Sequence, residues 1–192
     1  MKGIIRTLGV VVAVAVLFTV GAGSASAQLN SNTGTVTLNA TLAESLTVAV
    51  NSGSSVNFTL APNTAVNGGS TTSGITTAWV LKPGRTSVAV WAYFSSAASA
   101  MVHQDPLNTS DIPSSAVQIG VNAGPFAALT SVSPFNAAAS GLQIGASIAI
   151  TGANKSSSRS DTLAYNIDTT GVPQLPADTY IGTLNIQAQA TP

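Results

Sequence analysis

The chain has 192 residues, of which 45% are hydrophobic and only 6% are charged, and it contains no cysteine. The lack of cysteine excludes a disulfide framework, and the scarcity of basic side chains argues against a nucleic-acid partner. The length suits one domain with a sizeable core.

The N-terminus has the pattern of a secretory signal peptide. Lys2 and Arg6 precede an almost unbroken apolar run at residues 8–20, and Ala25-Ser26-Ala27 resembles a cleavage site. The run is shorter than the roughly 20 residues of a membrane anchor. We therefore expect a signal peptide over residues 1–27 and a single domain over residues 28–192. That domain is expected outside the cytoplasm (secreted, periplasmic or cell-surface), with no membrane span after cleavage.

Alternating apolar and polar residues predict an all-β domain. Residues 35–50 alternate, with a break at residues 43–45 that predicts a bulge or a bend. The two strands expected on either side of the Lys82-Pro83-Gly84-Arg85 turn are the best candidates for a hairpin, at residues 75–81 and 87–94. Further expected elements are strands at residues 56–60, 117–121, 142–151 and 161–168, a helical turn at 136–140, and a long surface loop at 95–115.

The final stretch, residues 175–190, alternates most regularly. Tyr180, Leu184 and Ile186 fall on one face, whereas uncharged amides and threonines fall on the other. This pattern indicates a strand with one buried face, and we expect the strand to be paired on both sides within its own domain. Seven or eight short strands separated by Gly, Pro, Asn and Ser predict an Ig-like antiparallel β-sandwich.

Residues 175–186, Leu-Pro-Ala-Asp-Thr-Tyr-Ile-Gly-Thr-Leu-Asn-Ile, resemble the final hairpin of exported bacterial Ig-like sandwich proteins. In those proteins, which include fimbrial-type subunits and spore-coat-like secreted proteins, a Pro-Ala-Gly-x-Tyr-x-Gly-x-Leu-x-Ile run leads into the last strand. Asp178 replaces the usual Gly, and the disulfide of many pilus subunits is absent. The resemblance implies a structural or adhesive protein without an active site.

The same resemblance bears on residues 34–42. They either form the first strand of their own sandwich or leave it to complete the sheet of another copy by strand addition.

Candidate catalytic residues are few. His103 is the only histidine, and with Asp105 it could bind a metal weakly or orient a serine as in a hydrolase. Zinc sites need three or four His, Cys or carboxylate ligands, and no second His or any Cys is present. We therefore expect no catalytic residue, no metal site and no cofactor.

Trp91 and Tyr93 fall on the face opposite Val88, Val90 and Ala92 in the most apolar predicted strand. Either the aromatic pair faces outward and stacks on a sugar ring, or the strand is central and covered on both sides. The sequence thus predicts a non-enzymatic structural or adhesive protein that assembles with itself. The alternative is a carbohydrate-binding module using Trp91 and Tyr93, with surface glycans as partners.

Overall fold

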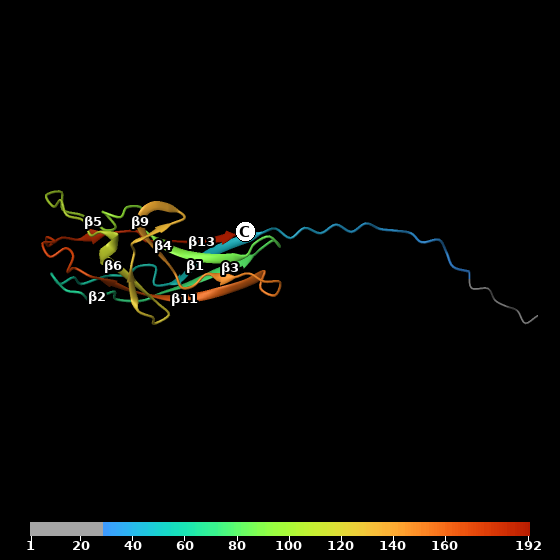
Figure 1. Ribbon diagram of the computed structural model, residues 1–192, viewed down its shortest axis with the longest axis horizontal. Helices are drawn as coiled ribbons and strands as arrows, with labels where there is room; N and C mark the ends of the chain where they lie inside the picture. Colours follow the sequence, from blue (N-terminus) through green and yellow to red (C-terminus); the bar gives the residue numbers. More distant parts are fainter. Residues whose placement is uncertain (1–28) are drawn as a thin grey trace, which may run out of the picture. The chain divides into compact units, whose positions relative to one another are not determined.

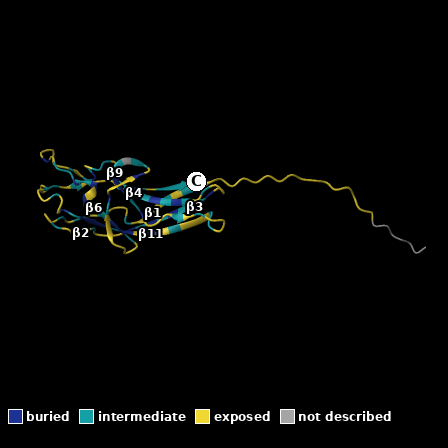
Figure 2. Ribbon diagram, viewed as in Figure 1, coloured by how far each residue is buried: buried dark blue, intermediate teal, exposed yellow. Residues whose placement is uncertain are grey.

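The computed structural model describes residues 29–192, so the predicted signal peptide lies outside the described residues. The chain divides into two units, Met1–Thr41 and Leu42–Pro192. In the first unit, residues 29–41 are exposed throughout and contain no strand (Figure 2). No helix in the described part of the chain is long and apolar enough to cross a membrane.

The second unit is all-β, as predicted, and its first sheet is antiparallel (Figure 1). Its strand order is β1-β3-β11-β6-β7, and β2 pairs with the end of β11. The strands are β1 (Ser45–Ser52), β2 (Asn67–Gly68), β3 (Ser73–Val80), β6 (Val117–Val121), β7 (Phe126–Ala128) and β11 (Ser156–Ile167). A single 3₁₀ turn, η1 (Ser114–Ala116), precedes β6.

The second sheet is built around β4. On one side β4 pairs with β13, and on the other it pairs with β9 and β10, while β8 pairs with β9. A separate ribbon joins β12 to β5. The strands are β4 (Ser87–Tyr93), β5 (Val102–His103), β8 (Ser131–Ser133), β9 (Asn136–Gln143), β10 (Ile148–Ala149), β12 (Tyr180–Ile181) and β13 (Asn185–Thr191).

The core lies between the two sheets, which makes the unit a β-sandwich. It combines Ile75 from β3, Val90 from β4, Ile119 from β6 and Leu163 from β11, each 1% exposed or less. Burial alternates along β3 and β4, because successive side chains of a strand point to opposite faces. The alternation of apolar residues in the sequence therefore identified the inner faces of these strands correctly.

The predicted hairpin of residues 75–81 and 87–94 is wrong. The two strands exist as β3 and β4, but they belong to different sheets. The turn between them closes with a hydrogen bond from the Arg85 N–H to the Lys82 carbonyl oxygen, at 3.2 Å. It carries the chain from one sheet to the other because the apolar faces of both strands must meet across the core.

Three other expectations are also corrected. Residues 35–42 form no strand, and regular pairing starts only at Ser45. Residues 136–140, expected as a helical turn, are the start of β9. Within residues 29–192 the closing strand β13 pairs only with β4, so it is an edge strand and is not paired on both sides.

Candidate functional site

The main concave feature of the sandwich is a groove between the facing edges of its two sheets. One wall is residues 50–62, which run from the end of β1, and the other is residues 175–186, which run through β12 into β13. Two cavities of about 430 and 540 Å³ lie along it and share Val56, Asn57, Phe58, Met101 and Tyr180. We call this continuous feature the edge groove.

The floor of the edge groove is the hydrophobic core itself. Phe94, Val117 and Tyr165 line the first half of the groove, which is the 430 Å³ cavity. Ile167 lines the second half, which is the 540 Å³ cavity. These four side chains are at most 9% exposed. An apolar residue on either wall therefore lies directly above the core with no further layer over it.

Val50 shows that the groove is an opening in the sandwich. It is opposite Ile75 in the β1–β3 register, so its side chain is on the inner face of the sheet. Ile75 is 1% exposed, but Val50 is 48% exposed. An inner-face valine stays half exposed because nothing from the second sheet covers this part of β1.

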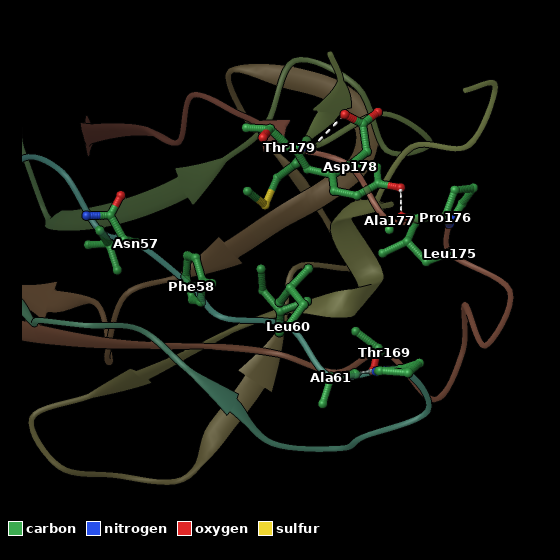
Figure 3. A pocket seen from close by; sticks show the side chains of 15 residues that line it. Asn57, Phe58, Leu60, Ala61, Thr169, Leu175, Pro176, Ala177, Asp178 and Thr179 are labelled. Carbon is green, nitrogen blue, oxygen red and sulfur yellow. Dashed lines mark hydrogen bonds between the residues drawn. The ribbon is translucent and has the colours of Figure 1, made fainter. Parts of the chain in front are cut away.

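The second half of the groove is the larger cavity, of about 540 Å³ (Figure 3). Phe58 and Leu60 stand on one side of it, and residues 175–178 stand on the other. Thr169 forms part of its base. The sequence predicted a short strand at residues 56–60, but the structure pairs only Phe58, through a single bridge to Gly69.

Asp178 fixes the outer wall of this half. Its carboxylate accepts hydrogen bonds from the Asn108 side chain at 2.8 Å and from the backbone N–H groups of Gln104, Asp105 and Thr179. The Asn108 hydrogen bond, with the backbone donors, holds the pKa of Asp178 below its ordinary value. The loop of residues 104–108 is thereby tied to the groove wall.

Both walls offer unpaired backbone. Asn57 directs its N–H and its carbonyl oxygen to Ser70, at 3.1 and 2.8 Å. Because successive residues of an extended chain point their amides to opposite sides, Val56 and Phe58 direct theirs away from Ser70, where no backbone hydrogen bond to a described residue occupies them. Within the described residues, the groove-facing edges of β1 and β13 also pair with no strand.

Trp91 and Tyr93 lie on β4, on the face opposite Val88, Val90 and Ala92, which are fully buried. β4 is a central strand, yet both aromatic side chains remain partly exposed. Trp91 and Tyr93 are thus neither fully exposed, as a sugar-binding pair would be, nor fully covered, as on a strand buried on both faces. This face is separate from the edge groove.

His103 pairs with Asp111 and not with Asp105. The His103 Nδ1 atom is 2.7 Å from Asp111 Oδ1, which also accepts the His103 backbone N–H at 3.1 Å. The backbone and side-chain hydrogen bonds from His103, with one from the Ser99 hydroxyl, lower the pKa of Asp111. Among residues 29–192, no group of three His, Cys, Asp or Glu side chains is placed to hold a metal ion.

Sequence reasoning missed the edge groove. Its wall residues Val50, Val56, Phe58 and Leu60 were identified only as apolar positions of strands. The one available signal was the Asn51-Ser52-Gly53-Ser54 turn cluster, which interrupts the apolar pattern at the point where β1 stops pairing with β3. Comparison with protein families, with curated proteins and with solved structures finds nothing that matches this chain.

Proposed function

We propose that this chain is an exported structural subunit, Ig-like in fold, that assembles with copies of itself at the cell surface. The observation that carries the proposal is the edge groove, where the core opens between two strand edges. A strand that entered the groove would bury core side chains and satisfy the free backbone groups at once.

The occupant we propose is the segment of residues 35–42 from a second copy. Its sequence, Thr-Val-Thr-Leu-Asn-Ala-Thr-Leu, alternates as a half-buried strand does. Yet Val36, Leu38 and Leu42 are 84–90% exposed. Burial of such side chains contributes about 1.5–3 kcal/mol each, which gives the segment a strong tendency to find an apolar groove.

The length and charge of residues 35–42 also match those of the edge groove. Eight residues in an extended strand span roughly 26 Å, the same length of chain as the wall from Gly53 to Leu60. The segment carries no charge, and Asp178 is the only charged residue that lines the groove. Neither partner therefore needs to desolvate an unpaired charge at the centre of the contact.

The groove is closed at the end next to the start of β1. This favours occupation by the segment of a second copy over occupation by the segment of the same chain. Next to the start of β1, Leu46 and Ala190 pack into one cluster with Trp79. Arg85 donates to Glu44 at 2.8 Å and to the Ala190 carbonyl oxygen at 3.2 Å. A segment of the same copy would have to turn back past this closed end, whereas a segment of a second copy needs no such turn.

Support for the cell surface comes from the sequence. The pattern of residues 1–27 is that of a signal peptide, and the ending at residues 175–186 resembles those of exported Ig-like proteins. An uncharged polar surface suits close packing against other copies and also suits contact with glycans.

The proposal predicts two complementary ways to block assembly of the mature protein. Leu38→Asp places a charge on the apolar face of the donor segment, and Val50→Arg places one in the groove. Each variant is expected to be monomeric in analytical ultracentrifugation, whereas the parent protein forms larger species visible by electron microscopy. A mixture of the two variants should form a 1:1 dimer, because each still supplies what the other lacks.

Thr37→Asp is the matched control, since it adds the same charge to the opposite face of the segment and should leave assembly intact. A strictly monomeric parent protein would overturn the proposal. So would a mixture that contains only monomers, because the intact segment of one variant would then not bind the intact groove of the other. Leu38→Asp and Val50→Arg should both unfold cooperatively, as a folded domain does, which separates loss of assembly from loss of fold.

A further inference from the structure

A second candidate binding surface lies on the outer face of the β4 sheet. Trp91 is at its centre, with Gln187 of β13 opposite it on one side and Gln143 of β9 opposite it on the other. Directly opposed residues on neighbouring strands share a face, so these three side chains form one row across the sheet. This row is independent of the edge groove and of any assembly through it.

Tyr93 and Phe135 border the row. Their rings stack with centroids 5.9 Å apart and an interplanar angle of 28°. The Tyr93 hydroxyl donates to Gln187 Oε1 at 2.9 Å. Tyr93 is therefore held in place by these two contacts. Among the described residues, no aromatic side chain stacks on Trp91, so its ring remains available to a ligand.

The two glutamines present opposite halves of their amides. Gln187 uses its oxygen to accept from Tyr93, so its NH₂ group remains available as a donor. Gln143 uses its NH₂ group to donate to the Gly145 carbonyl oxygen and to Ser147 Oγ, at 3.2 and 3.0 Å, so its oxygen remains available as an acceptor. Trp91 thus has a donor on one side and an acceptor on the other, each fixed by a neighbouring contact.

No charged residue stands on the outer face of β4 or opposite it on β13. The outer-face positions of β4 are Ser87, Ala89, Trp91 and Tyr93, and their partners on β13 are Thr191, Gln189, Gln187 and Asn185. A ligand for this face therefore needs apolar C–H surface for the indole and hydroxyl groups for the two amides, but no charge. Those are the properties of a neutral sugar ring, whose C–H faces contact aromatic π-surfaces and whose hydroxyls both donate and accept.

We propose that this face binds a neutral polysaccharide, with one pyranose ring over Trp91 and its hydroxyls bonded to Gln187 and Gln143. Because a polysaccharide lies across many subunits, one weak site per copy is sufficient when the copies are linked.

Native affinity electrophoresis of the full mature protein tests this proposal. The probes are gels containing a neutral β-glucan, a neutral galactomannan, or the polyanion alginate. Retardation is expected in at least one neutral gel and not in alginate, and Trp91→Ala should weaken it about tenfold, or about 1.4 kcal/mol. Gln143→Leu with Gln187→Leu should weaken it while Trp91 is still present, which shows that the amides take part.

Phe126→Ala is the matched control because Phe126 is a 47% exposed aromatic residue on β7 of the other sheet. It should leave retardation unchanged, and Trp91→Phe should restore most of what Trp91→Ala loses. Absence of retardation in both neutral gels overturns the proposal, as does retardation that Trp91→Ala leaves unchanged. The monomeric Leu38→Asp protein should still show retardation that depends on Trp91, weakened by the loss of multivalency, so failure here is distinguishable from failure of the assembly proposal.

Discussion

At the scale of single residues, two buried threonines have opposite surroundings. Thr77 and Thr169 are both 0% exposed. No hydrogen-bond partner lies near the Thr77 hydroxyl. The Thr169 hydroxyl donates toward the Ala61 carbonyl oxygen at 2.7 Å and accepts from the Thr64 N–H at 2.8 Å. An unpaired buried hydroxyl costs stability, whereas a paired one holds two segments together.

These surroundings predict opposite effects of one substitution. Thr77→Val removes an unpaired hydroxyl and should raise the free energy of unfolding by about 1 kcal/mol. Thr169→Val leaves the Thr64 N–H and the Ala61 carbonyl without their partner and should lower it by about 1–3 kcal/mol. Urea denaturation of both variants measures the difference, and a change of the same sign in both would contradict the assignment.

At the scale of elements, the wall of the edge groove depends on a close approach at Gly182. This glycine lies between β12 and β13, in the Tyr-Ile-Gly-Thr-Leu part of the final stretch. A Cβ atom there would overlap the Ala100 carbonyl oxygen and lie 2.8 Å from Met101 Cγ. The absence of a side chain therefore lets the wall lie against the residues that lead into β5.

Gly182→Ala should separate β12 from β5 and lower the free energy of unfolding by about 1–3 kcal/mol, because the backbone must shift to relieve the overlap. Gly152→Ala is the matched control, since a Cβ atom at Gly152 would meet nothing within 4 Å. Thermal or urea unfolding compares the two variants. Equal stability in both would show that the wall is not packed in this way.

At the scale of the whole molecule, the few charges act mainly through hydrogen-bonded carboxylates. The pKa of Glu44 is lowered by the Arg85 hydrogen bond, and that of Asp168 by the Thr170 hydroxyl. Asp111 and Asp178 have lowered pKa values for the same kind of reason. A carboxyl group with a lower pKa in the folded state stabilises the fold above its unfolded pKa and stops doing so as pH falls through the folded pKa.

The four carboxylates together predict a fold whose stability stays level from pH 7 down to about pH 5 and declines progressively below about pH 4, as their contribution is lost. The urea midpoint should fall over that acidic range. Asp178→Asn should lower the midpoint at pH 7 and make the acidic decline shallower. A midpoint that stays constant or rises between pH 4.5 and pH 2 would contradict this prediction.

The alternation in the sequence predicted most of the longer strands and the buried faces of several of them. Alternation identified the buried sides of β3, β4 and the closing strand, because a strand over a core must place its apolar residues at every second position. The same local signal overestimated order at residues 35–42, where the alternation is present but, among the described residues, no neighbouring strand pairs with it.

Which strands pair with one another depends on long-range contacts, which the tertiary structure shows. The turn at residues 82–85 has the same sequence signature whether its strands form a hairpin or cross between sheets, and the choice depends on where distant β13 and β11 lie. The edge groove has the same origin, since Val50 and Ile75 are both inner-face residues and only the placement of the second sheet leaves one of them exposed. Strand pairing joins residues about a hundred positions apart, and period-two patterns carry no information over that separation.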